Sequence, residues 1–532
     1  MMKNIILTGC LLLSVSLLGA KNTPKTEHYQ DNWKSLRKHE VPQWAKDAKF
    51  GIYAHWGVYS VTGNWDYTRP NWANYYITGY LGYYQTNQRG EQAKLFRKNV
   101  GDIRNGVGYK DLAKQFKAEK FDPKYWAKLI KRSGAQYAGI CAVHHDGYCM
   151  WDSEITDLCA GKTGPKRDLI ADIYKELRAE DLKIIATFHH GRTYKHFENV
   201  TKRFEGKKEF ANVDLLNEKN WNYYWYMGTK DRFAKNRYDL TVEFIDKYKP
   251  DILWFDGGGG KFGTEKILSH FFNMGIDQKK EVCVHNKGNF GKNFGIYSYE
   301  NGAHRPSFVD WPWEDDTPSA VGWCDWQWNK GIKYKKSRDV IVRLCDLVAR
   351  NGGLLLSMNP RPDGTFDKAQ EDLLLGIGKW LDQNGEAIYG TKPWVVYGEG
   401  HLEDLFFSET QPKTGKKSRE IQPNTALFNE RDVRFTAKNN TLYATFLGTD
   451  LGRECRIKTL KEGVKISDKN QIESIHLLGH GKVKYKREKD GLHIYLPKKL
   501  PNNVALSFRI EVKGELLENQ LNGTNGVLPL QT

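Results

Sequence analysis

Short apolar runs that alternate with amphipathic helices constrain this chain more than any other feature. Between about residues 49 and 360, the runs have the length and composition of strands buried on both faces of a parallel sheet. Repeated strand–helix units predict an α/β fold, and over this length the best match is a closed (β/α)8-like barrel. The runs read FGIYAHW, YAGICAVHH, KIIATFHH, DILWFD, EVCVHN and GGLLLSMNP. In one intervening helix, the residues predicted to share a buried face are Leu169, Ile170, Ile173, Tyr174 and Leu177.

The sequence pattern changes near residue 395. Apolar and polar residues then alternate, as in VRFTAKNNTLYATFLG and VALSFRIEV, with polar turns between the segments. This pattern is typical of an antiparallel β-sandwich. We therefore expect the barrel at residues 21–394, a C-terminal β-sandwich at 395–515 and a loose tail at 516–532.

The first twenty residues have the pattern of an export signal. Lys3 precedes the apolar run IILTGCLLLSVSLLGA, and the small residues Gly19 and Ala20 form a cleavage site. The run is too short for a resident membrane span, so we expect a periplasmic or extracellular protein with no stable membrane span. The letters LTGC resemble a lipoprotein box ending at Cys10, but the apolar stretch before them is very short, which favours cleavage after Ala20.

Net charge indicates the kind of partner to expect. The chain carries a formal charge of +17, which raises the possibility of nucleic-acid binding. The basic residues are dispersed, however, and the densest runs, KTGKKSR and KVKYKREK, lie far from the barrel strands in the sequence. We therefore expect no nucleic-acid partner and favour a basic surface suited to an anionic polysaccharide.

Polar residues stand where the predicted strands end. Because side chains at the carboxyl ends of barrel strands surround one site, these residues predict a single polar pocket. Asp256 is followed by four glycines, which would let a ligand approach its carboxylate closely. The strand-end residues are His55, His144, His145, His189, His190, Asp256, His285 and Asn286.

A metal site is the alternative use of such a cluster. His144, His145 and Asp146 are adjacent, but neighbouring side chains on a strand point to opposite faces, and no HExxH motif occurs. The cysteines also lack zinc or disulfide spacing, and Cys141, Cys283 and Cys345 lie in apolar or helical segments as expected for buried thiols. We expect no metal and no cofactor, and a pocket that binds sugar hydroxyls.

Five motifs resemble those of one known family. FGIYAHWGVYSV, VHHDGYCMWDSEITD, LWFDGG, NGGLLLSMNPRPDGT and AIYGTKPWVVYGEG look like the α-L-fucosidase family, glycoside hydrolase family 29, in the same order. The resemblance covers nearly the whole chain after the signal. It implies a fucose-containing glycan as substrate and a retaining mechanism with two carboxylates and no metal. By position in LWFDGG, Asp256 would be the nucleophile.

The resemblance leaves the second carboxylate open. Glu300, in IYSYENG, matches one branch of the family and is favoured as the acid/base, at the expected end of a sixth strand. Glu314, in WPWEDD, matches an alternative assignment, and Asp310 or Asp315 would be further choices.

The same matching implies a set of sugar-binding residues. His55, Trp72, His144 and His145 would hold hydroxyls, and His189 or His190 would occupy a further position on the third strand. Trp323 or Trp326 would lie near the apolar patch that accepts the sugar's methyl group.

Three departures from the family pattern lie around the implied sugar site. Asn71 precedes Trp72 where the family often has Glu, Lys287 stands where Arg is usual, and the segment GWCDWQWNKG replaces an SWGY-like segment. Lysine lacks the planar fork of arginine, so the second change is not conservative. The departures raise two alternatives to an α-L-fucosidase: an enzyme with another sugar preference, such as an α-L-galactosidase, and an inactive sugar-binding relative.

Overall fold

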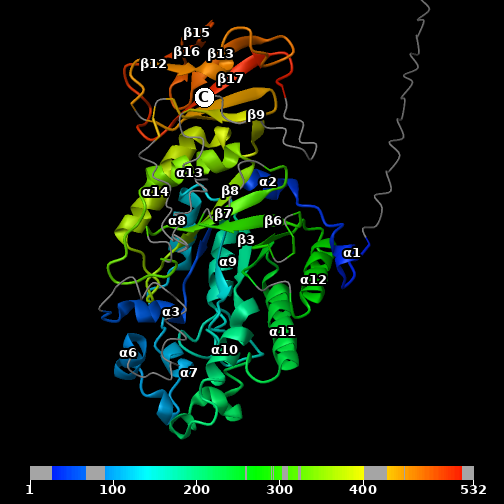
Figure 1. Cartoon of the computed structure of the whole chain (residues 1–532), viewed down its shortest axis with the longest axis vertical. Coiled ribbons are helices and arrows are strands. Elements are labelled where there is room, and N and C mark those ends of the chain that lie inside the picture. The colour runs from blue at the N-terminus through cyan, green and yellow to red at the C-terminus, as the bar shows by residue number, and fades with distance from the viewer. Residues whose placement is uncertain are drawn as a thin grey trace, which may run out of the picture.

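The structure is a computed structural model of the chain. It describes residues 27–67, 90–257, 261–288, 290–291, 293–301, 309–321, 325–400, 428–429, 431–448 and 450–517. The expected signal segment with Cys10, the sugar-binding candidates Trp72 and Trp323, and nearly all of the expected tail lie outside these residues. Figure 1 shows a barrel in the middle of the molecule and β-sheets stacked at the end that carries the C-terminus.

Eight parallel strands close into a barrel in chain order, with β8 pairing with β1. Phe50 opposite Leu354 sets the register of that closing pair. This arrangement confirms the predicted barrel. The strands are β1 Phe50–Ala54, β2 Tyr137–Val143, β3 Lys183–Phe188, β4 Ile252–Phe255, β5 Cys283–Asn286, β6 Ile296–Glu300, β7 Trp313–Pro318 and β8 Gly352–Met358.

The sequence analysis did not anticipate strand β7. Its sequence, WEDDTP, contains three consecutive acids, yet all six residues are buried. Asp315 points out of the barrel and forms an ion pair with Arg343 of the helix that follows, while Glu314 and Asp316 have partners inside. A strand that satisfies each carboxylate in this way shows none of the apolar pattern on which strand prediction relies.

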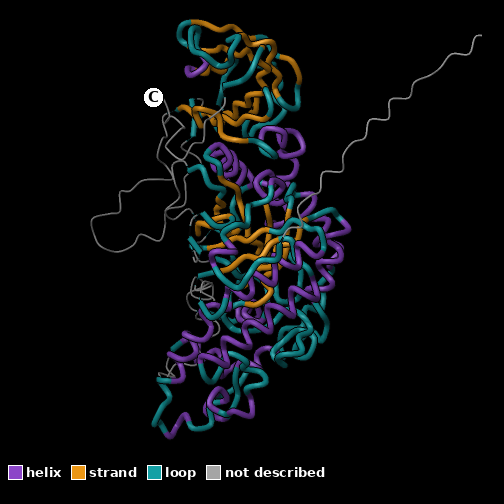
Figure 2. Tube along the Cα trace, turned by 90° about the vertical axis from the view of Figure 1, so that its right-hand side faces the viewer, coloured by secondary structure: helices purple, strands orange, loops and turns teal. Residues whose placement is uncertain are grey.

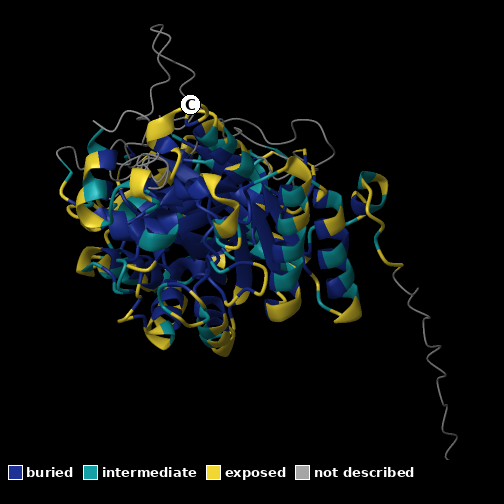
Figure 3. Ribbon diagram, turned by 90° about the horizontal axis from the view of Figure 1, so that it is seen from below, coloured by how far each residue is buried: buried dark blue, intermediate teal, exposed yellow. Residues whose placement is uncertain are grey.

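Helices cover the outside of the barrel, and Figure 3 shows their exposed residues surrounding a buried interior. The apolar face predicted for α9 is confirmed, since its five residues are all buried. The helices of four or more residues are α1 Trp33–Leu36, α2 Gln43–Ala48, α3 Val58–Val61, α6 Glu91–Asn99, α7 Tyr109–Ala113, α8 Pro123–Arg132, α9 Leu169–Ala179, α10 Thr193–Thr201, α11 Lys230–Tyr248, α12 Thr264–Asp277, α13 Ser337–Ala349 and α14 Lys368–Asn384.

Two antiparallel sheets form the C-terminal domain, as predicted. One has the order β14-β13-β17-β11-β10-β9 and the other β12-β16-β15, and Phe435, Phe508 and Ile494 belong to one apolar cluster shared between them. Figure 2 shows these strands well separated from those of the barrel. The expected division after residue 394 falls inside β9. The strands are β9 Lys392–Glu399, β10 Val433–Lys438, β11 Thr441–Phe446, β12 Glu454–Ile457, β13 Gln471–Leu477, β14 Gly481–Lys482, β15 Tyr485–Glu488, β16 Gly491–Tyr495 and β17 Leu506–Lys513.

Three cysteines lie inside the protein, as expected from their apolar surroundings in the sequence. Cys141, Cys283 and Cys345 are buried free thiols, as predicted. Within the described residues, no helix combines the length and the apolar character needed to cross a lipid bilayer.

A buried ion-pair network joins the two domains. Asp346 of α13 accepts from Arg434 of β10 at 2.5 Å and from Arg350 at 3.1 Å, and the three side chains are about 1% exposed. The Arg350 guanidinium also lies 4.3 Å from the ring centre of Tyr397 in β9. The carboxylate of Asp346 therefore neutralises two buried cations at the domain boundary.

We expect Asp346→Asn to lower the free energy of unfolding by about 3–5 kcal/mol, because it leaves buried guanidinium groups without their counter-charge. Chemical denaturation measures this loss. Asp372→Asn is the matched control, since it makes the same change in an exposed pair with Lys368, and such pairs contribute about 0–1 kcal/mol. Equal effects of the two substitutions would contradict the structural role of Asp346.

Candidate functional site

A polar pocket opens where the barrel strands finish. It draws at least one residue from the end of each of the strands β1 to β6, so the predicted convergence of strand ends is observed for most of them. Nine residues line it: Tyr53, His55, His144, His189, Arg192, Asp256, Lys287, Glu300 and Trp326.

Asp256 follows the four buried apolar residues of β4 and is only 6% exposed. Its Oδ2 lies 3.3 Å from Nε2 of His145, and its Oδ1 lies 3.4 Å from Nζ of Lys287. Burial alone would raise the pKa of Asp256, but the Lys287 charge and the His145 hydrogen bond outweigh it and hold the pKa well below its ordinary value. Asp256 is therefore an ionised carboxylate, as a nucleophile requires.

Lys287 lies at the centre of the site. Its Nζ is 3.4 Å from Asp256, 3.4 Å from Oε2 of Glu300 and 3.0 Å from Oδ2 of Asp316. Burial favours the neutral amine, but these three carboxylates raise the pKa of Lys287 well above its ordinary value. A permanent positive charge thus stands between Asp256 and Glu300.

Asp316 anchors this arrangement from inside the barrel. It is fully buried on β7, and the hydroxyl of Tyr53 donates to its Oδ1 at 2.7 Å. Burial raises the pKa of Asp316 to about 7, although the Lys287 charge opposes the shift. The sequence analysis missed Asp316 and Tyr53. Alternation along WEDDTP could have placed Glu314 and Asp316 on one face, had the segment been recognised as a strand.

Glu300 shares the pocket of Asp256. It ends β6, as expected, and its side chain is 40% exposed, which leaves the carboxyl group accessible to solvent and to a leaving group.

Glu314 lies at the other end of the barrel, near the start of β7, and is 1% exposed. It accepts hydrogen bonds from Trp254 at 3.1 Å and Tyr137 at 3.0 Å, and its Oε2 lies 3.1 Å from Nδ1 of His285. Its partners are thus within the barrel, and it does not line the pocket.

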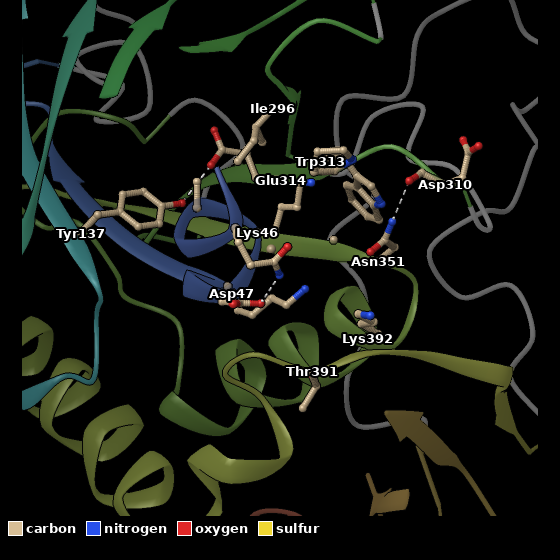
Figure 4. A pocket seen from close by; sticks show the side chains of 16 residues that line it. Lys46, Asp47, Tyr137, Ile296, Asp310, Trp313, Glu314, Asn351, Thr391 and Lys392 are labelled. Atoms are coloured by element: carbon tan, nitrogen blue, oxygen red, sulfur yellow. Dashed lines mark hydrogen bonds between the residues drawn. The ribbon is translucent and has the colours of Figure 1, made fainter. Parts of the chain in front are cut away.

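Figure 4 shows a second cavity, of about 310 Å³, at the end where the strands begin. Glu314, Tyr137, Trp313 and Asp310 line it together with Lys46. Asp315 points outward to Arg343. Of the four acids considered as partners for Asp256, the structure brings only Glu300 into the same pocket.

Three histidines form the opposite wall. His55, His144 and His189 are buried, and burial lowers the pKa of each, to about 3 for His55, so all three rings are neutral. A neutral imidazole offers one donor and one acceptor, which suits sugar hydroxyls. One nitrogen of each of the three lies within 4.8 Å of the others, so this group could also hold a metal ion.

The remaining predicted residues divide into two groups. His145 contacts Asp256, and Trp326 lines the pocket with its ring 5.6 Å from Nζ of Lys287. His190 points away, because its Nε2 lies 3.0 Å from the hydroxyl of Thr241 on α11. His189 faces the pocket, whereas His190 begins a short 3-10 helical turn after β3, and its ring points toward α11.

Arg192 is a pocket residue that the sequence analysis missed. It lies in the turn between β3 and α10, and a Cβ placed on Gly257 would meet its Nη2 at 1.9 Å. The first glycine after Asp256 therefore allows the guanidinium of Arg192 to lie against the backbone beside the carboxylate.

Comparisons with known proteins agree with this geometry. The family model described as alpha-L-fucosidase matches residues 16–386, and that of the alpha-L-fucosidase C-terminal domain matches residues 428–511. The chain is similar to tissue alpha-L-fucosidases of Rattus norvegicus (28% identity over 82% of each chain) and Homo sapiens (27%, over 94% of this chain and 96% of the other). It also resembles the solved Thermotoga maritima alpha-fucosidase in complex with fucose, with a TM-score of 0.66 and 26% identity over 91% of this chain and 100% of the other.

The charge of Lys287 predicts a pH effect. Removing the ammonium in Lys287→Met raises the pKa of the Asp256 carboxyl group. If activity requires ionised Asp256, the variant then loses activity at a higher pH than the wild type when the solution is acidified. We expect the acidic limb of kcat/KM against pH to move upward by about one unit or more.

Lys287→Arg is the control for this experiment, because it keeps the charge and should leave the acidic limb low. Thermal melting would verify that both variants are folded. An acidic limb that stays in place in Lys287→Met would show that the lysine does not set the ionisation of Asp256.

Proposed function

Because this chain belongs to the α-L-fucosidase family of glycoside hydrolases, we propose that it removes terminal α-L-fucosyl units from glycans with retention of anomeric configuration. The observation that carries the proposal is the pairing of Asp256 and Glu300 across Lys287 in one pocket. One carboxylate is buried and held in its ionised form, and the other is exposed to solvent. Retaining glycosidases use two carboxyl groups with different roles, one ionised as the nucleophile and one that donates and accepts a proton.

In the first step, a carboxylate oxygen of Asp256 attacks the anomeric carbon while Glu300 donates its proton to the departing glycosidic oxygen. The bond to the aglycone breaks and an ester between Asp256 and fucose forms. In the second step, Glu300, now a carboxylate, takes a proton from water as the water oxygen attacks the same carbon. The ester bond breaks, Asp256 recovers its charge and fucose leaves.

The other pocket residues would hold the sugar. The neutral rings of His55, His144 and His189 have the donors and acceptors that hydroxyl groups need. Trp326 offers an aromatic face to the apolar side of the sugar and its methyl group. Exo-acting cleavage is proposed because these side chains and the two carboxyl groups would together contact one terminal sugar unit.

The sequence supports three finer features of the proposed function, namely the location of the enzyme, the charge of its substrate and its sugar preference. The apolar N-terminal segment supports export to the periplasm or the cell exterior, and the charge of +17 supports an anionic polysaccharide, such as a sulfated or algal glycan, as the natural substrate. Lys287 in place of the family's arginine favours, as the second candidate, an altered sugar preference such as α-L-galactosides.

Asp256→Ala should abolish hydrolysis of an aryl α-L-fucoside, since no other described carboxylate is positioned to form the ester.

Glu300→Ala should lose more than about a hundredfold in kcat with a natural leaving group, within the usual effect of a general acid. With an aryl α-L-fucoside, whose leaving group departs without protonation, azide should restore turnover in Glu300→Ala by attacking the ester in place of water, giving a fucosyl azide detectable by mass spectrometry.

Glu314→Gln serves as the comparison for the acid/base assignment. Glutamine keeps the shape of the buried side chain, so the variant should retain the chemistry and lose stability instead. Azide rescue of a Glu314 variant, together with normal turnover in Glu300→Ala, would reverse the assignment.

Exhaustive chelation provides a separate test of the mechanism, because neither proposed step needs a metal. Activity measured after dialysis against a strong chelator should equal the starting activity. In a separate measurement of stereochemistry, the first-formed sugar observed by NMR should be the α-anomer. Loss of activity that returns on adding a divalent ion would instead indicate a metal at His55, His144 and His189.

A further inference from the structure

The pocket contains two cationic side chains with very different surroundings. Lys287 is buried and shared by three carboxylates, so its charge is already compensated. Arg192 is exposed, and within the described part of the chain its guanidinium forms no ion pair with a carboxylate. It nevertheless lines the same pocket as Asp256 and Glu300.

The sequence next to the pocket offers no acid for Arg192 either. The stretches 258–260, 302–308 and 322–324, which directly continue the described pocket segments, contain no Asp or Glu, and neither does 68–89. An arginine that faces a ligand site without an internal counter-charge is suited to bind an anion, because its planar fork matches oxyanions in a bidentate manner.

Gly257 fixes where this guanidinium stands. A Cβ at that position would lie 1.9 Å from Nη2, 2.7 Å from Cζ and 2.8 Å from Nε of Arg192, so the whole group lies close against the glycine backbone. The contact is next to Asp256 in the chain. A substituent held by Arg192 would therefore lie beside the carboxylate that attacks the sugar.

The order of strands indicates which part of the substrate Arg192 meets. Arg192 follows β3 and Glu300 ends β6, with Asp256 and Lys287 after the intervening strands β4 and β5. The acid must stand next to the departing oxygen. In this order Arg192 and Glu300 lie on opposite sides of Asp256, so a group bound by Arg192 would belong to the sugar itself rather than to the leaving group.

We propose that Arg192 binds an anionic ester group, such as a sulfate, on a hydroxyl of the sugar in the pocket, and that the enzyme selects esterified fucose. This inference rests on the proposed function and deepens it by placing the anionic group on the fucosyl unit itself and by assigning the residue that binds it. The positive net charge would attract such substrates to the surface, whereas Arg192 would select among them at the site.

The test compares an aryl α-L-fucoside with its monosulfates at O2, O3 and O4. The wild type should accept at least one monosulfate, and Arg192→Gln should reduce the ratio of kcat/KM for that ester over the neutral fucoside by roughly tenfold to a hundredfold, as expected for a lost charge-assisted contact. Arg192→Lys should recover part of the ratio.

Lys195→Gln is the matched control. It removes one positive charge from α10 at an exposed residue paired with Glu198, outside the pocket lining, so it should leave the ratio unchanged. A second substrate, with neutral fucose on a sulfated or uronic acid neighbour, separates the two possible positions of the anion. Sensitivity of only this substrate to Arg192→Gln would overturn the placement on the fucosyl unit.

Other outcomes separate this inference from the proposed function. Hydrolysis of the neutral fucoside with rejection of every monosulfate, or an unchanged ratio in Arg192→Gln, would overturn the inference while leaving the fucosidase intact. If the wild type hydrolysed none of the compounds, the proposed function would fail. In that case, calorimetry of a fucose monosulfate would still test the anion site. Binding to the wild type that is lost in Arg192→Gln would support the site, and no binding to the wild type would overturn it.

Discussion

The shared ammonium of Lys287 is the interaction on which the site depends. Asp256, Glu300 and Asp316 approach to within 3.4 Å of one Nζ atom, and without that charge they would repel one another in a largely buried space. The lysine allows the carboxylate of Asp256 to remain ionised inside the barrel mouth. It also sets the spatial relation between Asp256 and Glu300, which the proposed double displacement requires.

A lysine can fill this position only because the surrounding structure restrains it. Lysine is a flexible point charge and has no rigid fork to fix its direction. Here Asp316, held in turn by Tyr53, fixes the amine from below, and the rings of Trp254 and Trp326 lie 4.9 and 5.6 Å from Nζ. Lys287 is thus held by a cage of one acid and two indoles.

The sequence contained enough information to predict the barrel and most of the pocket. Apolar runs ended at His55, His144, His189 and Asp256, and the ends of parallel strands necessarily meet. Strand β7 was missed because its acids are neutralised by partners distant in sequence, Arg343 and Lys287 among them. Such pairings depend on tertiary contacts, which local periodicity does not reveal.

The choice between His189 and His190 could not be made from sequence for a related reason. Alternation predicts that one of two neighbours faces the pocket, but the phase depends on which residue ends the strand. The position of Glu314 required the same knowledge. Glu314 lies two positions before Asp316 on the same face of β7, which places its carboxylate about 7 Å deeper in the barrel interior, away from the pocket.

Trp254 connects the two carboxylate groups inside the barrel. Its indole Nε1 donates to Glu314, while its ring lies beside the Lys287 ammonium. One side chain therefore contacts both Glu314, deep in the barrel, and Lys287, at the pocket. The attraction between the Lys287 ammonium and the Trp254 ring holds this ring directly below the pocket. Glu314 therefore helps to hold the Trp254 ring in place below Lys287 and contributes to the stability of the barrel interior. On this argument, a carboxylate far from the pocket has a structural role, and the chemistry proposed for Asp256 and Glu300 takes place at the strand ends above it.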